Sequence, residues 1–202
     1  MTGLKLYHYW RSSSSWRVRW ALDLKGIPHE LVAVSLLNGE SESPEHLRRH
    51  PMGYVPVLET PDGFLSQSAA IIHWIEETFP GSPSLFPENT WLHSRVLQLS
   101  DMISADTQPI QNVPVLQMHS QDAGEQKRWA QHFISSGLQA YEAVAQGTTG
   151  KFSVGDELTY ADLCLMPQIY NAERYEVSMA QFPLLQKIAA ECQRLPSYQS
   201  SH

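Results

Sequence analysis

The chain has 202 residues, which is enough for one large domain or two small ones. Hydrophobic residues make up 42%, so the chain can bury a core and is not globally disordered. Its 14 basic and 21 acidic residues give a net charge of −7, which argues against a general nucleic-acid binder, because such a protein presents a basic surface.

Short β-prone runs alternate with amphipathic stretches in the first 80 residues, in the order β-α-β followed by β-β-α. Gly26 ends the first helix, Ser43 and Pro44 open a short second one, and Asp62-Gly63 marks a hairpin turn. The expected strands cover 4–9, 29–36, 55–59 and 64–65, and the expected helices cover 15–26, a segment within 38–49, and 66–79.

The second half of the chain is predicted to be helical. Three prolines and a glycine within 79–89 mark the linker that precedes it. The expected helical stretches are 91–116, 125–146, one that opens at Thr159, and 182–195. Thr159 and Asp162 have the spacing of a capping box, and the run that follows has no polar face, so this helix should be the buried centre. The sequence predicts an α/β half followed by an all-α half.

Several classes of protein and site are excluded by the sequence. No apolar run reaches about 18 residues, so no membrane span is expected. The N-terminal segment meets an arginine and a serine run before any apolar region, which is unlike a secretory signal. Two cysteines cannot build a disulfide framework, and none of the nine histidines stands in an H-E-x-x-H pattern, so no metal is assigned. We expect a soluble, cytoplasmic protein with reduced thiols.

A cluster of serines, Ser12 to Ser15, lies between the first expected strand and helix. Unpaired backbone N–H groups and the positive end of the helix dipole meet there, so the place can stabilise an anion, including a thiolate. Helix capping explains any one of these serines, but four in a row exceed what a cap requires. The surroundings lack G-x-S-x-G and the glycines of a P-loop, which excludes a nucleophile elbow and a nucleotide loop.

Three arginines close to this cluster, Arg11, Arg17 and Arg19, suggest an anionic ligand, because guanidinium groups bind carboxylates through two hydrogen bonds. An alternative remains open for two of them. Arg19 can pair with Asp23 on one helix face, and Arg17 can be a surface or interface residue.

Two further positions can contact an extended anionic ligand. Gln67 and Ser68 begin a helix after a strand, which is a second N-terminal anion site, although ordinary capping explains it too. A cis peptide bond between Val55 and Pro56 would turn the Val55 backbone outward, but the sequence by itself favours the trans form.

Five motifs in order along the chain resemble those of zeta-class glutathione transferases. The first two are YWRSSSSWRVRWALDLKGI, similar to the N-terminal signature SSCSxRVRIAL, and PMGYVPVLE, similar to the cis-proline strand. The next two are LSQSAAIIHWIEE, similar to the glutathione-binding segment QSxAIIxYLEE, and DTQPIQNVPVL, similar to a helix that reaches the active site. The last is VGDELTYADLCLMPQIYNAERYEV, similar to VGDxxTxADLCLVPQxxNAERFxV.

The resemblance implies a thioredoxin-like, glutathione-binding domain over 1–81, a linker over 82–88 and an all-helical domain over 89–202 that contributes the substrate site. It implies that Ser12, with Ser13 beside it, lies near the glutathione sulfur as the catalytic group. The implied glutathione contacts are Ser12, Ser13, Val55, Gln67, Ser68, Gln108 and Asn112. Arg11 and Arg174 would face the carboxylates of a small anionic substrate.

The chain departs from the family pattern in four places. Ser14 stands where the motif usually has cysteine, so any role of that thiol is absent. His50 replaces an asparagine, and Ser41 lies where some members have a glutamine that contacts glutathione. The tail up to His202 is shorter than in many members, which implies thinner cover over the site.

The implied activity is the glutathione-dependent cis–trans isomerisation of maleylacetoacetate to fumarylacetoacetate, by thiolate addition, bond rotation and elimination. This step belongs to tyrosine and phenylalanine breakdown, and a glutathione transferase side activity is implied with it. Isomerisation of maleylpyruvate, or glutathione transfer to α-haloacids, is the alternative, and a non-catalytic glutathione-binding protein is the third. The resemblance also implies a homodimer, with neither nucleic acid nor membrane as partner.

Overall fold

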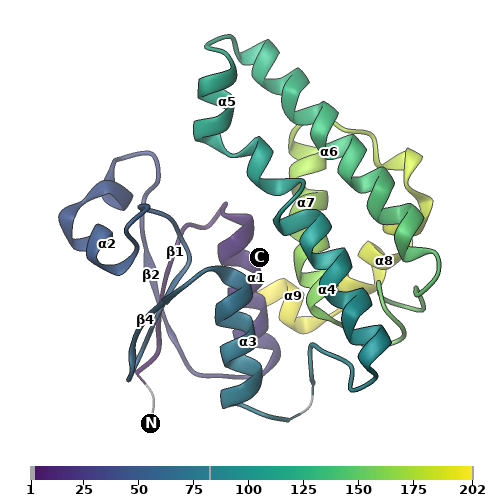
Figure 1. Ribbon diagram of the computed structural model, residues 1–202, viewed down its shortest axis with the longest axis horizontal. Coiled ribbons are helices and arrows are strands. Elements are labelled where there is room, and N and C mark those ends of the chain that lie inside the picture. Colours follow the sequence, from purple (N-terminus) through teal and green to yellow (C-terminus); the bar gives the residue numbers. More distant parts are fainter. Residues whose placement is uncertain (1–2, 82, 202) are drawn as a thin grey trace. The chain divides into compact units, whose positions relative to one another are not determined.

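The computed structural model describes residues 3–81 and 83–201 (Figure 1). Residues 1, 2, 82 and 202, which fall in the expected N-terminal segment, linker and C-terminal tail, lie outside the described residues. The chain divides into two compact units, Met1–Ser84 with Pro196–His202, and Leu85–Leu195. Among the helices of the described residues, none is long and apolar enough to span a bilayer.

The first unit contains a four-stranded sheet in the order β2-β1-β3-β4. β1 (Lys5–His8) runs parallel to β2 (Glu30–Ala33) and antiparallel to β3 (Val57–Thr60), and β4 (Gly63–Ser66) pairs antiparallel with β3. The predicted β-α-β and β-β-α order is confirmed.

The expected and observed strand bounds differ by one residue at most positions, and two expected bounds are wrong by two or three residues. β2 stops at Ala33 instead of residue 36, because its pairing with β1 ends there, opposite His8. β3 begins at Val57 instead of Val55, because Pro56 has no N–H group to donate to the ladder.

Helices α1 (Ser13–Leu24) and α3 (Ser68–Thr78) pack against each other in the first unit, and α2 (Pro44–Arg49) is the predicted short helix. Gly26 ends α1 as predicted. It has φ +62°, a conformation that costs glycine little. The hydrogen bond from Ile27 N–H to Leu22 O at 2.9 Å then closes the helix end.

The second unit is helical, as predicted. Its helices are α4 (Thr90–Ser104), α5 (Val113–His119), α6 (Ala123–Ala145), α7 (Tyr160–Arg174) and α8 (Pro183–Gln193). The prediction of one continuous helix over 91–116 is wrong, because a 3₁₀ turn over Gln108–Gln111 separates α4 from α5. Pro109 and Pro114 each remove a backbone donor and restrict the residue before them, so an unbroken helix cannot form there.

Helix α7 is the predicted buried centre of the second unit, and α4, α6 and α8 contact it. The capping box is present. The fully buried Asp162 accepts hydrogen bonds from Thr159 N–H at 2.9 Å and from Ser153 N–H at 2.8 Å. Burial raises the pKa of Asp162, while these hydrogen bonds lower it. The carboxylate thereby links the start of α7 to the preceding loop.

The chain returns to the first unit at its end, which the sequence analysis did not predict. A short helix, α9 (Pro196–Ser201), lies beside α1 (Figure 1). Tyr198 packs its ring against Trp16 and Trp20, with centroids 5.6 and 5.3 Å apart. The C-terminal segment is therefore part of the first unit.

Candidate functional site

Ser12 caps the N-terminus of α1. Its backbone is extended, and its Oγ accepts a hydrogen bond from Ser15 N–H at 3.2 Å. The Ser12 N–H in turn donates to Tyr9 O at 3.0 Å, which forms the turn between β1 and α1. Since the oxygen of Ser12 acts as an acceptor towards the helix, its hydroxyl hydrogen can be donated to a ligand. Together with the positive end of the helix dipole, this hydroxyl can stabilise an anion such as a thiolate.

The other serines of the cluster have different places in the helix. Ser13 is the first residue of α1 and is buried, and Ser14 is half-buried one position later. Ser15 is fully buried, and its Oγ accepts from Tyr9 N–H at 3.5 Å, which ties the end of β1 to the helix. Capping and this tie account for Ser12 and Ser15, the two ends of the cluster.

Arg11 precedes the cluster and lies outside the helix. Its guanidinium stacks over the Trp10 ring, 5.3 Å from the centroid. Its Nε is buried and has no hydrogen-bond partner within the part of the chain that the structure describes. A buried donor of this kind is unfavourable unless a ligand satisfies it, which makes Arg11 a candidate contact for an anion.

The structure contradicts the alternative roles of these two arginines, Arg17 as a surface residue and Arg19 as the partner of Asp23. Arg17 is 1% exposed, so it is not a surface residue, and its Nη1 donates to Ser68 Oγ at 3.3 Å. Arg19 is also buried and donates to Trp10 O at 3.1 Å, whereas Asp23 accepts from Ser200 Oγ. Sequence spacing suggested the pairing of Arg19 with Asp23 because it treats helix faces as exposed, but α1 is covered from Ser15 to Leu22.

The two predicted contacts of an extended ligand, Val55 and the start of α3, lie in the same unit as Ser12. The Val55-Pro56 bond is cis, and Val55 stands just before the ladder of β3 begins. Gln67 caps α3 with φ +72°, a strained conformation for a residue other than glycine, and such strain concentrates at functional sites. Ser68 is the first residue of α3, and its hydroxyl accepts a hydrogen bond from the positively charged Arg17. This charge and the N-terminus of α3 together favour an anion.

His46 and His50 support the loop that leads to Val55, and the sequence analysis missed the first of them. His46 is 1% exposed, and its Nε2 donates to Tyr54 O at 2.9 Å. His50 is buried and accepts from Met52 N–H at 3.2 Å. Burial, then the neighbouring His46, lowers the pKa of His50. The spacing of four residues between the histidines was the signal that could have found the pair.

The remaining predicted residues lie in the second unit. Gln108 Nε2 donates to Asn112 Oδ1 at 3.0 Å, so the structure brings these two together. Arg174 is the last residue of α7 and is exposed, with its guanidinium 5.0 Å from the Tyr175 ring centroid. Glu176, the acidic residue two positions after Arg174, forms an ion pair with Lys127 at 2.6 Å.

Comparison with known proteins places this geometry in context. Residues 6–83 match the family model "Glutathione S-transferase, N-terminal domain", and residues 108–199 match "Glutathione S-transferase, C-terminal domain". The chain is 42% identical over 199 residues to the maleylacetoacetate isomerase of Mus musculus, covering 98% of this chain and 91% of that protein.

Solved structures of isomerases are also similar to this chain. A maleylacetoacetate isomerase from Anaeromyxobacter dehalogenans 2CP-1, with GSH bound in its active site, is 43% identical with a TM-score of 0.91, covering 100% of this chain and 95% of that one. A bacterial maleyl pyruvate isomerase, a glutathione S-transferase of the zeta class, is 36% identical with a TM-score of 0.94, covering 98% and 95%.

Proposed function

Because the chain belongs to the glutathione S-transferase family and, within it, to the zeta class, we propose that it catalyses the glutathione-dependent cis–trans isomerisation of maleylacetoacetate to fumarylacetoacetate. The observation that carries this proposal is the Ser12 hydroxyl, which accepts from the first turn of α1 and so can donate to a thiolate. Bound glutathione supplies a thiolate that adds to the conjugated double bond, permits rotation about it and then leaves.

Glutathione fits the polar groups of the first unit. Its backbone can pair with Val55, which lies outside the strand ladder. Its γ-glutamyl carboxylate suits the N-terminus of α3, where Gln67 and Ser68 lie and Arg17 adds a buried positive charge. Gln108 and Asn112 are the contacts that we assign to the second unit.

Ser12 acts on the proton of the thiol. An ordinary thiol has a pKa of about 8.5 and is mostly protonated at neutral pH. A hydrogen bond from the Ser12 hydroxyl, with Ser13 beside it, favours the thiolate, and a shift of one pKa unit requires only about 1.4 kcal/mol. Both serines lie where the positive end of α1 adds to this effect.

Two arginines bind the substrate carboxylates in this proposal. Arg11 has a buried Nε for which the described residues provide no acceptor. Arg174 is exposed, and its neighbour Glu176 is engaged with Lys127. Guanidinium groups would orient a dicarboxylate and stabilise the charge that develops on the enolate.

The second candidate is the isomerisation of maleylpyruvate, which is favoured by the similarity to the solved maleyl pyruvate isomerase. Glutathione transfer to α-haloacids would use the same activated thiol. The test is to assay the purified protein with maleylacetoacetate, maleylpyruvate and a haloacid, each with and without glutathione. Faster turnover of maleylpyruvate would replace the first assignment with the second, and binding of glutathione without any turnover would leave a binding protein.

We also infer the organisation and setting of the protein. Residues 1–81 are the glutathione-binding domain, 82–88 the linker, and the helical domain that begins at residue 89 adds the substrate site. The expected end of that domain, 196–202, belongs to the first unit instead. A homodimer is supported by large apolar side chains on the surface of the first unit, among them Met52 and Phe64, which are 63% and 49% exposed. Both cysteines are buried and in the thiol form, which suits the reducing cytoplasm, where tyrosine and phenylalanine breakdown would employ the enzyme.

A further inference from the structure

Arg19 is a buried cation whose guanidinium reaches four acceptors. Nε donates to Ser201 O at 3.0 Å and Nη2 donates to Trp10 O at 3.1 Å. Nη1 is 3.2 Å from His8 Nδ1 and 3.5 Å from Tyr9 O. The acceptors therefore come from two distant segments, the end of β1 with the loop that follows it, and the C-terminal helix.

The first segment leads directly to the thiol-activating serine. The carbonyl of Tyr9 accepts from Arg19 and also from Ser12 N–H, at 3.0 Å. Trp10 O is held by the same guanidinium. Since the position of the Ser12 hydroxyl follows from the path of this backbone, any shift of the Tyr9 or Trp10 carbonyl would move the hydroxyl relative to its ligand.

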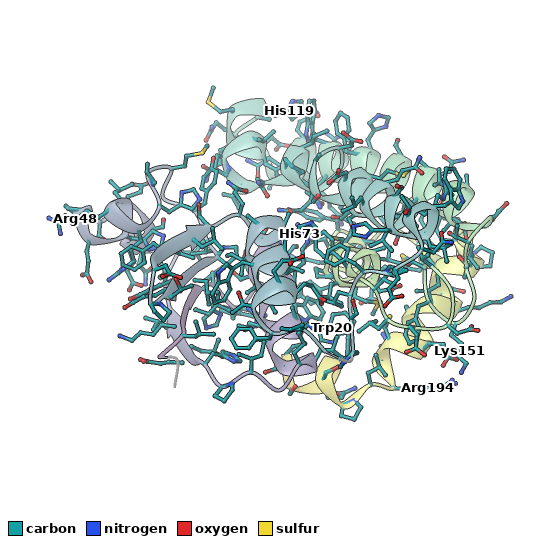
Figure 2. All side chains as sticks on the ribbon, turned by 60° about the horizontal axis from the view of Figure 1, so that its bottom comes forward. Trp20, Arg48, His73, His119, Lys151 and Arg194 are labelled. Atoms are coloured by element: carbon teal, nitrogen blue, oxygen red, sulfur yellow. The ribbon has the colours of Figure 1, made fainter. Side chains whose placement is uncertain are left out.

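The second segment is anchored to α1 by contacts of its own. Trp16 Nε1 donates to Ser201 Oγ at 3.1 Å, and Trp20 Nε1 donates to Ser197 Oγ at 3.0 Å. Figure 2 shows Trp20 at the contact between α1 and the C-terminal segment. The carbonyl of Ser201 is therefore a fixed point from which Arg19 can hold the loop.

We propose that Arg19 is a positioning residue of the thiol-activating site, which uses α9 as its anchor to hold the Tyr9–Trp10 backbone and thereby the Ser12 hydroxyl. The planar guanidinium suits this role because its donors point in fixed directions, whereas a lysine ammonium cannot reach several separated acceptors in one plane. This inference rests on the proposed function, since it concerns the same thiol.

The charged state of the groups around Arg19 agrees with this role. Burial lowers the pKa of Arg19 to about 10, and the charge of Asp23 partly opposes the shift, so the guanidinium stays charged at neutral pH. Burial, the charge of Arg19 and that of His29 lower the pKa of His8 to about 4, so the ring is neutral and can accept from Nη1. The bonds to the loop are therefore charge-assisted and strong.

The decisive substitution is Arg19→Lys, because it keeps the positive charge and removes the planar guanidinium with its several N–H donors. If Arg19 positions the loop, ultraviolet titration should show the pKa of the bound glutathione thiol rising by about one unit, with kcat falling about tenfold. The KM for glutathione should change by less than about threefold, since most groups that bind the tripeptide are untouched. A thiol pKa and kcat equal to those of the wild type would mean that only the charge matters, and would overturn the proposal.

A second variant leaves Arg19 in place and removes its anchor. Truncation after Leu195 deletes α9 and should raise the thiol pKa in the same direction. The matched control is Ser197→Ala, which removes the hydrogen bond of Trp20 to α9 but no partner of Arg19. It should leave the thiol pKa unchanged, whereas a rise equal to that of the truncation would show that α9 acts by packing and would refute the role of Arg19.

A measurement without glutathione separates this inference from the proposed function. Amide hydrogen exchange of residues 9–15 in the free protein should be faster in Arg19→Lys and in the truncated chain, and unchanged over 63–78. Unaltered exchange over 9–15 would refute the positioning role. Faster exchange with an unchanged thiol pKa would reduce Arg19 to a structural residue. Failure of the wild type to bind glutathione would refute the proposed function, while the exchange comparison still decides whether Arg19 and α9 order the loop.

Discussion

Replacing Ser12 with alanine should lower turnover far more than it lowers the affinity for glutathione. The Ser12 oxygen accepts from Ser15 N–H at 3.2 Å, so the hydroxyl hydrogen is the group that remains for a ligand. In the proposed function this hydrogen is donated to the thiolate. The rest of the tripeptide is held elsewhere, by Val55 and by Gln67 with Ser68, so most of the binding free energy should survive.

Two losses of different size follow from the structure. The N-terminus of α1 loses the acceptor for one N–H group, which lowers the free energy of unfolding by about 1 kcal/mol. The thiolate loses one charge-assisted donor, which is worth about 1.5–3 kcal/mol, or about one to two pKa units. Loss of such a donor from a developing or reacting anion costs about 2–4 kcal/mol of transition-state stabilisation.

The assay is ultraviolet titration of bound glutathione together with steady-state turnover, and Ser43→Ala is its matched control. Ser43 caps α2 in the same unit, and its Oγ accepts from His46 N–H at 3.2 Å, the same bond at the same distance. Both variants should lose similar stability against urea, but only Ser12→Ala should raise the thiol pKa.

Two results would refute this reasoning. An unchanged thiol pKa and turnover in Ser12→Ala would transfer the role to Ser13 or to the backbone N–H groups of α1. An equal rise of the thiol pKa in Ser43→Ala would mean that loss of helix capping, and not loss of the hydroxyl, disturbs the site.

Three further outcomes are expected. Arg174→Lys should lower kcat/KM for a dicarboxylate at least about tenfold, because lysine cannot form the two hydrogen bonds that a guanidinium makes to a carboxylate. The kcat/KM for a chlorinated aromatic should barely change. Equal losses for both substrates would make Arg174 a structural residue. Since the pKa of His8 is lowered from 6.5 to about 4 in the folded chain, the unfolded chain takes up the proton first, and stability should fall as the pH drops from 6.5 towards 4. Urea midpoints of His8→Gln, which retains an acceptor for Arg19, should fall less over that range; an equal fall would contradict the assignment. Gly137→Ala should destabilise the second unit by about 1–3 kcal/mol in thermal unfolding, because the added Cβ would lie 2.1 Å from Thr107 Oγ1, and a gain in stability would refute this clash.

Local signals in the sequence determined much of the fold. Gly26 ends α1, Ser43 opens α2 and the capping box opens α7, each where the sequence predicted it. These features depend on hydrogen bonds between residues three to five positions apart, so neighbouring residues suffice to define them. The motifs around Ser12, Gln67 and Arg174 likewise identified the family and its candidate residues from the chain alone.

Tertiary structure alone decided which side chains of α1 are buried and what they contact. Spacing suggested that Arg19 pairs with Asp23, but the helix is covered by α3 on one side and by α9 on another. The bonds of Arg19 to Ser201 and of Arg17 to Ser68 join residues 182 and 51 positions apart, and no local pattern encodes such a separation. A buried guanidinium must find acceptors wherever the fold supplies them, because leaving its donors unsatisfied away from water costs more than any local pairing would gain.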